Sequence, residues 1–545
     1  MRENQTGFKK NYSTIDNSFS IHILFELLKL KKQKLYCMFI DFEKAFDNVW
    51  RKALWFKLLS HNINGKMFDF IFNMYNHIKS RIVCNDDTSE FFPCANGVRQ
   101  GENMSAFLFS LYLNDLHDFI DTSNIENLPT ISNMFEDKLN ILFKLFAILY
   151  ADDTVLIAEN PEELQKQLDR FYIYCNKWNL KINTDKSKLL VFSRGRHKDN
   201  YQLRYGNKLI EVVSEFNYLG VIFNRSGSFK TAKQKLVDKA TKALYEVLKR
   251  GRFHNLSIQC QLDLFDKIVQ PILLYGCEIW GFTNTAMIER VHLKFCKLLL
   301  HLKQSTPDFM IYGELGRYPM EIQIKTRMIS YWSKLISGKE TKIAHLFYKL
   351  GYNVNQELGG KIEWFENIKN ILNNCGISNV WINQYIDNKK WLKARVKLTL
   401  IDQFKQNWQA TLQSSPKALN YRIYKDELCF ENYFKILTIK DAHTLCRFRT
   451  CNNYLPIENG RWMNIPRNER ICNYCDLKEI GDEFHYILKC KDNLLKDERK
   501  RCLKVIHIQN ANIISFKQIM NNNKHCFLRK LCSFIRKINK TCSPT

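Results

Sequence analysis

The sequence lacks an apolar run long enough to cross a bilayer, and it lacks a secretory leader. The best candidate for a membrane span, residues 139–158, is interrupted by Lys144, Asp152 and Asp153, whereas a transmembrane helix needs about 18 apolar residues without a break. The N-terminus, Met-Arg-Glu-Asn-Gln-Thr-Gly, does not place a basic region before an apolar core, as a signal peptide does. These absences exclude a membrane-spanning or secreted protein, so we expect an intracellular one.

Acidic residues are scarce relative to basic ones. The chain has 55 Asp and Glu against 82 Lys and Arg, which gives a formal net charge of +27. Such an excess predicts an anionic macromolecular partner, most simply nucleic acid. Charge alone does not separate this interpretation from a basic solvated surface or from binding to a membrane surface.

The cysteine pattern does not indicate a disulfide framework. Eighteen cysteines in a long chain without a leader are better explained as reduced thiols together with a metal site. One group has ligand spacing, namely Cys472, Cys475, His485 and Cys490. Three thiolates and one imidazole suit a closed tetrahedral zinc site, which leaves no position for a reactive water. Chance pairs of buried thiols are the alternative, but four ligands in order favour structural Zn²⁺.

At 545 residues the chain is too long for one hydrophobic core. Residues 1–200 mix short apolar runs with helical patterns, residues 230–430 are mainly helical, and residues 431–545 are rich in Cys, Asn and basic side chains. The last 55 residues hold 13 Lys and Arg against 3 Asp and Glu, which predicts a phosphate-contacting arm or, alternatively, a solvated helical tail. Glycine and proline are expected to mark helix ends at Pro271, Gly276, Pro307, Gly313 and Pro319.

Three carboxylates follow predicted strands. Residues 36–40 form an apolar run that ends at Asp41, and residues 145–150 and 154–158 are two more, separated by Ala-Asp-Asp. This pattern predicts a hairpin with Asp152 and Asp153 at its tip. Adjacent central strands would bring all three carboxylates to one sheet end, where they could hold divalent cations such as Mg²⁺. Each signal alone is weak, because an Asp-Asp turn is usually only a turn.

Further elements follow in order. Asn160 is expected to cap a helix that begins at Pro161. A strand is predicted at 188–193, a hairpin at 201–211 around Gly206-Asn207, and an apolar strand run at 216–223. The sequence therefore predicts an α+β fold.

Four motifs occur in a fixed order along the chain. They are Phe-Ile-Asp-Phe-Glu-Lys-Ala-Phe-Asp (39–47), Asn-Gly-Val-Arg-Gln-Gly-Glu-Asn-Met-Ser (96–105), Tyr-Ala-Asp-Asp-Thr (150–154) and Phe-Asn-Tyr-Leu-Gly (216–220). With these motifs the chain resembles the reverse transcriptases of non-LTR (LINE-type) retrotransposons, matching in turn their palm motifs A, B, C and E. The similarity extends from Gln5 through Pro271-Ile-Leu-Leu-Tyr-Gly to the cysteine cluster.

The resemblance implies a right-hand polymerase with a palm, partial fingers and a helical thumb, followed by a helical region and a small zinc-knuckle-like module. The corresponding ranges are 1–200 (partial fingers and palm), 201–300 (palm end, primer grip and thumb), 301–430 (helical connection) and 431–545 (zinc-knuckle-like module and tail). It implies an RNA-directed DNA polymerase that uses an RNA template, a DNA primer or target and deoxynucleoside triphosphates. The family resemblance further implies the nucleus and the cytoplasm as its compartments; the oligomeric state stays unknown.

The resemblance also assigns roles to single residues. Asp41 and Asp152 would be the ligands of Mg²⁺ (or Mn²⁺), with Asp153 beside them near the primer end. Phe42, Phe46, Arg99, Gln100 and Lys186 would surround the nucleotide. Phe46 would act as a steric gate against the ribose 2′-hydroxyl, although an aromatic at such a position is ordinarily a core residue.

Lys186 in Leu-Lys-Ile-Asn-Thr-Asp-Lys-Ser-Lys (180–188) would be an acid toward the pyrophosphate leaving group, with Lys188 as the alternative. The primer grip would comprise Phe216, Tyr218 and Leu219, or these residues would simply form a buried strand.

The sequence departs from the family pattern at its start. Gln-Thr-Gly-Phe-Lys-Lys-Asn-Tyr-Ser (5–13) corresponds to the second fingers motif, and no endonuclease domain precedes it. We therefore expect a truncated copy of an element with an intact catalytic core. The alternatives are a nucleic-acid-binding relic that does not polymerise and a protein similar to group II intron maturases, against which the resemblance through residues 271–490 argues.

Overall fold

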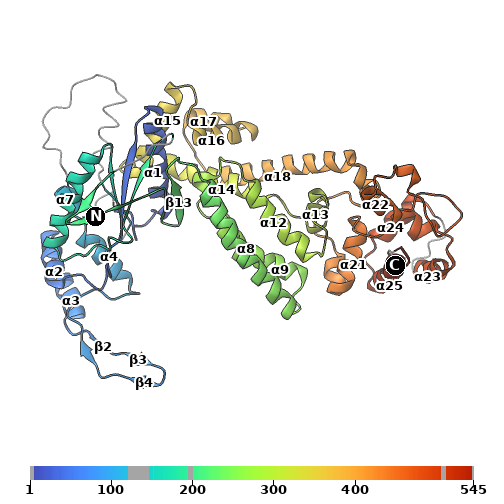
Figure 1. The fold of residues 1–545 in the computed structure, drawn as a ribbon, viewed down its shortest axis with the longest axis horizontal. Coiled ribbons are helices and arrows are strands. Elements are labelled where there is room, and N and C mark those ends of the chain that lie inside the picture. Colours follow the sequence, from blue (N-terminus) through green and yellow to red (C-terminus); the bar gives the residue numbers. More distant parts are fainter. Residues whose placement is uncertain are drawn as a thin grey trace. The chain divides into compact units, whose positions relative to one another are not determined.

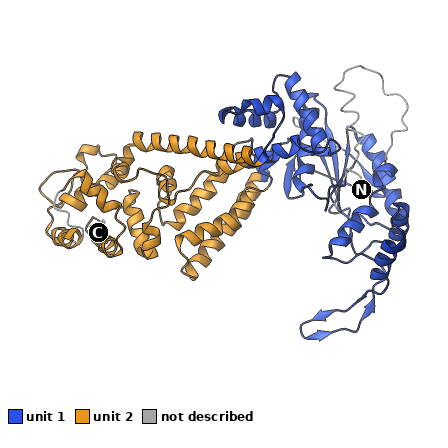
Figure 2. Ribbon diagram, turned by 180° about the vertical axis from the view of Figure 1, so that it is seen from behind, with its two compact units in different colours: residues 1–232, 276–283, 327–389 blue, residues 233–275, 284–326, 390–545 orange. Residues whose placement is uncertain are grey.

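The structure is a computed structural model and describes residues 5–120, 147–150, 152–193, 195, 201–504 and 511–542 (Figure 1). Two compact units interleave along the chain (Figure 2). The first comprises residues 1–232, 276–283 and 327–389, and the second comprises residues 233–275, 284–326 and 390–545. The fold is a mixed α+β fold, as the sequence predicts. The division into four ranges stays a prediction.

The first unit holds the β-strands. Its elements, wholly or mainly, are α1 (Thr14–Leu30), β1 (Leu35–Ile40), α2 (Arg51–Ser60), α3 (Gly65–Asn76), β2 (Lys79–Ser80), β3 (Val83–Cys84), β4 (Asp87–Thr88), β5 (Phe92–Pro93), α4 (Asn103–Tyr112), α5 (Leu116–Ile120), β6 (Ala147–Tyr150), β7 (Asp153–Ala158), α7 (Pro161–Lys177), β8 (Lys188–Phe192), β9 (Arg204–Tyr205), β10 (Lys208–Leu209), β11 (Glu211–Val213), β12 (Glu215–Tyr218), β13 (Val221–Asn224), α11 (Cys277–Trp280), α14 (Met320–Ile336), α15 (Ile343–Glu357), α16 (Glu363–Asn374) and α17 (Ser378–Asn383).

The second unit is helical in its described part. Its elements are α8 (Lys230–Phe253), α9 (Ile258–Leu264), η1 (Phe265–Val269), α10 (Gln270–Leu273), α12 (Ala286–Leu299), α13 (Asp308–Leu315), α18 (Lys389–Ser414), η2 (Pro416–Ala418), α19 (Tyr421–Tyr424), α20 (Tyr433–Ile436), α21 (Ile439–Arg449), α22 (Pro456–Trp462), η3 (Arg467–Glu469), η4 (His485–Lys489), α23 (Asn493–Leu503), α24 (Ile513–Met520) and α25 (His525–Cys542). Among the residues that the structure describes, no helix is long and apolar enough to cross a membrane.

A five-stranded sheet forms the centre of the first unit, in the order β11-β8-β1-β7-β6. β1 is antiparallel to β7 on one side and to β8 on the other. All six side chains of β1 are buried, because both faces of the sheet are covered. Met38 belongs to the core that includes residues of α4 and α7, whereas Phe39 points to the opposite face and stacks on Phe216, with ring centroids 4.3 Å apart.

Several predicted elements are confirmed. The two strands of the carboxylate hairpin are β6 and β7, and the predicted strand at 188–193 is β8. The Asn160 side chain accepts a hydrogen bond from the Glu163 N–H and so caps α7, which begins at Pro161. The predicted hairpin around Gly206 is β9 and β10.

The apolar run at 216–223 is not one strand. It folds back as the antiparallel pair β12 and β13, since Leu219 and Gly220 adopt φ values of 49° and 81°. Two consecutive residues with positive φ form the tight turn that matches the twist of a hairpin. Gly220 was the residue in the sequence that indicated a turn, but a prediction based on the run of apolar residues does not take a glycine into account.

The prediction that Gly313 marks a helix end is wrong. Gly313 lies inside α13, and the helix ends at Gly316, whose φ is 59°. A Cβ on Gly313 would lie 2.5 Å from the Tyr421 hydroxyl and 3.2 Å from the Trp408 ring, so this glycine is needed for close packing. Pro307 and Pro319 do precede α13 and α14, Gly276 precedes α11, and Pro271 is the second residue of α10, so these four mark helix ends as predicted.

The C-terminal segment is not an extended arm in its described part. Residues 493–503, 513–520 and 525–542 are helices, and α25 packs against α21 and α23. Its buried face is apolar and includes Phe527, Leu531 and Ile535. This apolar face is shielded from water by packing against the other helices, so the segment is a structural part of the second unit. Its basic side chains lie on the outer face.

A buried ion network joins distant segments of the second unit. The Arg449 guanidinium donates to both Glu314 carboxylate oxygens at 3.0 and 3.1 Å and to the Met520 carbonyl at 2.8 Å. It also pairs with Glu431 at 3.2 Å. Tyr433 donates to Glu314 at 2.6 Å. Burial raises the pKa of Glu314, but the charges of Arg449 and Lys425 and the hydrogen bonds from Arg449 and Tyr433 together outweigh burial and lower that pKa.

We expect Arg449→Ala to lower the free energy of unfolding by about 3–5 kcal/mol, because it leaves the Glu314 carboxylate buried without its cation. Urea denaturation followed by circular dichroism measures this change. Lys405→Ala, which removes an exposed cation from α18, is the control and should stay within about 0.5 kcal/mol. Equal effects of the two variants would contradict the role given to the network.

Candidate active site and metal centre

Strand register brings the three predicted carboxylates to one end of the sheet. Ile40 of β1 pairs with Thr154 of β7. One further step along this antiparallel register places Asp41 across from Asp153. Asp152 lies in the turn between β6 and β7, at the tip of the hairpin. The sequence prediction that one sheet end gathers these residues is therefore consistent with the pairing of the strands.

The electrostatics of these carboxylates reflect burial and their proximity. Burial raises the pKa of Asp153 to about 6, and the charges of Asp152 and Asp41 raise it further. The pKa of Asp152 is also raised, first by burial and then by Asp41. Like charges that share a half-buried site are repelled unless a cation neutralises them. Within the described residues, however, the Cys472 group is the cluster whose ligand atoms are close enough to hold a metal ion, and the three carboxylates do not form a second one.

A loop from the end of α7 to β8 runs beside Asp41. The Asp41 N–H donates to the Ser187 hydroxyl at 3.0 Å, and its carbonyl accepts from the Asn183 N–H at 2.8 Å. The Lys186 ammonium lies 3.8 Å from the Asp41 carboxylate and stays largely exposed. Lys188 instead pairs with Glu211 at the far strand β11. Of the two candidate lysines, Lys186 is thus the one near the carboxylates.

A second loop, at residues 94–101, is held against the segment after Asp41. The Gly97 N–H donates to the Val49 carbonyl at 2.9 Å, and the Val98 N–H donates to the Phe46 carbonyl at 2.8 Å. Gly97 has a φ of 83°, and a Cβ there would lie 2.8 Å from the Asp47 carbonyl oxygen. Only glycine permits this approach.

Arg51 is a positioning residue that the sequence analysis missed. It is nearly buried and donates to the carbonyls of Gly97 at 2.9 Å, Cys94 at 2.6 Å, Asn96 at 3.1 Å and Tyr75 at 3.0 Å. A single guanidinium therefore fixes the course of the loop. In the sequence, Arg51 looks like any other arginine, and its place at the start of α2 gives no sign of this role. No local signal could therefore have identified it as a positioning residue.

The predicted nucleotide residues lie near one another. The Phe46 ring is partly buried and stacks on Phe109, with centroids 5.1 Å apart. Gln100 donates to the Asp47 carboxylate at 3.1 Å, so it reaches the same segment. Phe42 is buried between Phe109 and Phe171, which makes it a core residue behind the site. Arg99 is exposed and pairs with Glu102 at 2.9 Å.

The predicted primer-grip residues follow the hairpin of β12 and β13. Phe216 stacks on Phe39, which lies two residues before Asp41. Tyr218 is buried, and its hydroxyl accepts from the Asn17 side chain at 3.3 Å. Leu219 lies in the turn with positive φ. The hairpin is thus packed on the back of the strand that carries Asp41.

The N-terminal segment also supports the hairpin, which the sequence analysis did not foresee. Thr6 donates to the Leu149 carbonyl through both its N–H, at 2.9 Å, and its hydroxyl, at 2.8 Å. The same hydroxyl donates to Asn17 at 2.9 Å. Leu149 lies on β6 close to Asp152, so this contact ties residues 5–6 to the strand that leads into the carboxylate tip.

The cysteine cluster has the dimensions of a tetrahedral metal site. The sulfurs of Cys472 and Cys490 lie 3.9 Å apart, and the Cys475 sulfur lies 3.4 Å from the His485 Nε2. Metal–ligand bonds of about 2.3 Å to sulfur and about 2.0 Å to nitrogen give tetrahedral edges of about 3.8 and about 3.5 Å. One ligand atom from each of the four residues lies within 4.8 Å of the others. The residues present therefore fit a metal ion.

Backbone pairing builds this cluster from two segments. The Cys472 N–H donates to the Glu479 carbonyl at 2.9 Å, which closes the turn that carries Cys475. His485 begins the π-helix η4, and Cys490 directly follows it, so the predicted short helical spacing is confirmed. The His485 Nδ1 lies 3.3 Å from the Glu479 carboxylate, an arrangement that orients the other ring nitrogen toward a metal.

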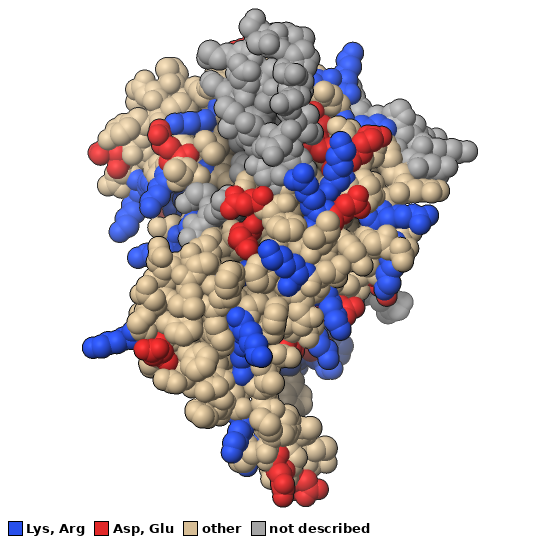
Figure 3. Space-filling model, turned by 90° about the vertical axis from the view of Figure 1, so that its left-hand side faces the viewer, with Lys and Arg blue, Asp and Glu red and all other residues tan. Residues whose placement is uncertain are grey.

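Charge is mixed on one face of the first unit. Figure 3 shows basic and acidic side chains interspersed there rather than gathered in one patch. The net charge of +27 is thus not concentrated on this face, and any basic site must be sought elsewhere.

Comparison with known proteins supports the predicted family. Residues 1–223 match the family model of the reverse transcriptase (RNA-dependent DNA polymerase). The chain is 24% identical over 300 residues to the RNA-directed DNA polymerase from the mobile element jockey of Drosophila funebris, covering 54% of this chain and 31% of that protein. It is 24% identical over 343 residues to the Pol polyprotein of the type-1 retrotransposable element R2 of Popillia japonica, covering 60% of this chain and 54% of that protein.

The chain spans about a third of the length of the jockey protein that it matches. A solved telomerase structure from Candida albicans, 13% identical, covers 62% of this chain and 54% of that one with a TM-score of 0.23, which is too low to compare folds. The sequence matches and the ordered motifs agree on one family. Residues 1–223 are similar to reverse transcriptases, and the chain as a whole is similar to RNA-directed DNA polymerases of non-LTR retrotransposons.

Proposed function

We propose that this chain is an RNA-directed DNA polymerase that joins a deoxynucleoside triphosphate to a primer 3′-hydroxyl on an RNA template. The observation that carries the proposal is the pairing of β1 with β7, which sets Asp41 across from Asp153 within a reverse transcriptase domain. In the reaction, the primer oxygen forms a bond to the α-phosphorus in line with the leaving pyrophosphate, whose bond to that phosphorus breaks.

Asp41 and Asp152 are the proposed ligands of Mg²⁺ or Mn²⁺, with Asp153 beside them. Hard carboxylate oxygens at the end of rigid strands suit these ions, and the raised pKa values of Asp152 and Asp153 mark a place where a cation relieves repulsion. Bound divalent ions lower the pKa of the primer hydroxyl and offset the charge of the leaving group. Lys186, exposed beside Asp41, is the proposed proton donor to the pyrophosphate.

The loop that Arg51 fixes is the proposed floor of the nucleotide site. Gln100 and Arg99 lie on this loop and would contact the incoming nucleotide. Phe46 presents its ring from the segment after Asp41 and would exclude a 2′-hydroxyl, while Phe42 supports it from the core. The hairpin with Phe216, Tyr218 and Leu219 would hold the primer end.

The proposed architecture is a right-hand polymerase. Residues 1–200 would supply partial fingers and the palm, residues 201–300 the palm end and thumb, residues 301–430 a helical connection, and residues 431–545 a zinc-knuckle-like module. In that module Cys472, Cys475, His485 and Cys490 would hold one structural Zn²⁺. A relic that binds nucleic acid without polymerising is the alternative, and primer extension on a homopolymer RNA template distinguishes the two.

Asp152→Asn should reduce magnesium-dependent primer extension by more than about a hundredfold, since even changes outside the ligand shell cost a metal site up to that factor. Circular dichroism and RNA binding should be unchanged, because Asp152 is not a core residue. Asp169→Asn, an equal change on the exposed face of α7, is the control. Comparable extension by the Asp152 variant would refute the assignment, and a wild-type chain without activity would favour the relic.

Phe46→Val should raise the incorporation of ribonucleotides relative to deoxynucleotides, because the shorter side chain leaves room for the 2′-hydroxyl. The ratio of kcat/KM for the two nucleotides measures this selectivity. Phe119→Val removes another partly buried ring, which packs on Tyr174, and should leave the ratio unchanged. If Phe46→Val lowers stability but not selectivity, the ring is core packing only.

Metal analysis of the purified chain should find about one zinc per chain bound in a site closed by four protein ligands. Cys475→Ser should lose this metal and expose the C-terminal segment to protease, because folding and binding are linked in such sites. Cys526→Ser, at an exposed cysteine of the same unit, should retain both metal and protection. A metal-free chain with an equally protected C-terminal segment would contradict the zinc assignment.

A further inference from the structure

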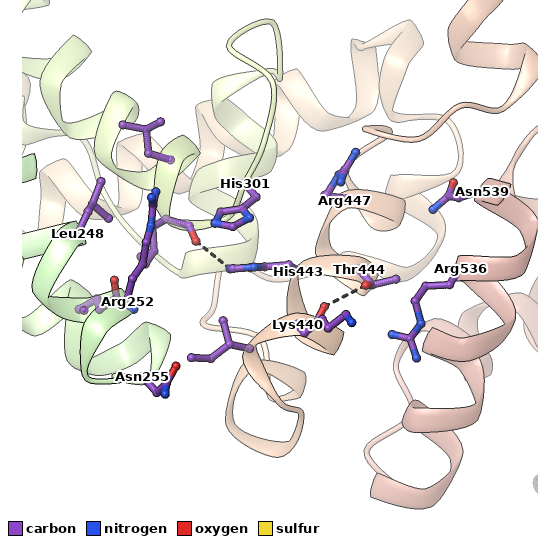
Figure 4. A pocket seen from close by; sticks show the side chains of 15 residues that line it. Leu248, Arg252, Asn255, His301, Lys440, His443, Thr444, Arg447, Arg536 and Asn539 are labelled. Carbon is purple, nitrogen blue, oxygen red and sulfur yellow. Dashed lines mark hydrogen bonds between the residues drawn. The ribbon is translucent and has the colours of Figure 1, made fainter. Parts of the chain in front are cut away.

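A cavity of about 620 Å³ lies within the second unit. Its walls come from α8, the end of α12, α21 and α25. The volume falls within the range of ligand sites. Figure 4 shows Arg252 on one side of His443, and Arg447 and Arg536 on the other. Three segments that lie far apart in the sequence thus contribute cations to one space.

The charged residues of the lining are all basic. Among the described residues that line the cavity there are Arg252, Lys440, Arg447 and Arg536, and none is acidic. Arg536 pairs with Asp441, which lies outside the lining. Within the described part of the chain, the guanidinium groups of Arg252 and Arg447 make no hydrogen bond or ion pair. Two arginines held in one cavity without a protein partner indicate an anionic ligand.

Two histidines form an uncharged surface inside this basic site. The His301 and His443 rings lie 4.2 Å apart at 30°, and the His443 Nε2 is 2.9 Å from the Leu299 carbonyl. Burial lowers the pKa of His443 to about 4, helped by His301 and Arg447. Burial, Arg252 and Arg447 also lower the pKa of His301. Both rings are therefore neutral at pH 7 and offer flat faces next to the cations.

Two exposed aromatic side chains lie around Lys303, close in sequence to the cavity residue His301. Only two residues beyond His301, the Lys303 ammonium lies 5.7 Å from the Tyr454 ring centroid and 5.9 Å from that of Trp462. Trp462 is 60% exposed and Tyr454 39%. A tryptophan side chain is ordinarily buried to a large extent in a folded protein. An exposed indole and phenol next to a lysine ammonium form the combination that binds unpaired bases.

We propose that the cavity and the Tyr454–Trp462 pair together bind a single-stranded nucleic acid, with phosphates at Arg252 and Arg447 and a base on Trp462. Only the choice of nucleic acid as the polyanion rests on the proposed function; the site itself is separate from the carboxylates. A duplex fits less well, because its bases are already stacked and leave no face for Trp462. A small free polyanion would use the arginines but not the aromatic pair.

The metal cluster positions one wall of this site. Tyr474, between Cys472 and Cys475, donates its hydroxyl to the Thr541 carbonyl at 2.7 Å, and Thr541 lies on α25 beyond Arg536 and Asn539. The Cys532 thiol of the same helix donates to the Asp441 carbonyl of α21. These contacts hold α25 against α21, so the two helices keep their cations on one cavity.

The test uses the full chain with Asp152→Asn, so that no polymerisation occurs, and a fluorescent single-stranded RNA without secondary structure. Affinity is measured at several salt concentrations. Arg252→Gln with Arg447→Gln should reduce the slope of log K against log salt by about 1.4, since each phosphate contact on a single strand contributes about 0.7. Trp462→Ala should weaken binding by about fivefold or more without changing this slope, because stacking releases no counterions.

Arg395→Gln with Lys405→Gln is the matched control. It removes the same charge from the exposed side of α18, a helix that does not line the cavity, and it should leave the slope nearly unchanged. Equal slopes for the cavity and control variants would overturn the proposal. So would tripolyphosphate that competes as well as RNA while Trp462→Ala has no effect, since that marks a small-anion site. Primer extension by the chain with Asp152 intact tests the polymerase separately.

Discussion

The antiparallel pairing of β1 with β7 is the constraint on which the arrangement of the three carboxylates depends. Its register matches Ile40 with Thr154, so Asp41 and Asp153 leave the sheet as neighbours. A shift of one residue would turn every side chain of the strand to the other face. Because both faces of β1 are buried, against the Met38 core on one side and Phe216 on the other, such a shift would place the side chains of each face in the wrong core. Packing throughout the unit thus fixes the position of the carboxylates.

The loops around the carboxylates are ordered by hydrogen bonds that involve main-chain groups. Asn183 and Ser187 form hydrogen bonds with the main chain of Asp41. Arg51 donates hydrogen bonds to three carbonyls of the loop at 94–101 and to the carbonyl of Tyr75. The Lys186 and Gln100 side chains take no part in these supports, since Lys186 lies beside the Asp41 carboxylate and Gln100 donates to Asp47. A site whose supports are separate from its reactive groups can be rigid without occupying its own functional atoms.

The sequence predicts those features that depend on local pattern. The apolar runs predicted β1, β6, β7 and β8, Asn160 predicted the start of α7, and the spacing of the cysteines predicted the cluster of Cys472, Cys475, His485 and Cys490. Features that depend on partners distant in sequence were not predictable. Glu314 and Arg449 meet across 135 residues, and neither position differs locally from an ordinary surface charge. Gly313 was misjudged for the same reason, because Tyr421 and Trp408, which require its small size, are far away in the chain.

The basic cavity has an energetic consequence for the second unit. Arginines that face one space without carboxylates repel one another, and a folded protein retains such an arrangement only if other contacts offset it. The neighbouring imidazoles limit the repulsion, since Arg252 and Arg447 help to keep the pKa of His301 and His443 low, and neutral rings add no further charge. The contacts of α25 with α21 and the hydrogen bond from Tyr474 to Thr541 offset the remaining repulsion between the arginines. A polyanion in the cavity would remove the repulsion altogether, so ligand binding and the stability of this unit should rise and fall together.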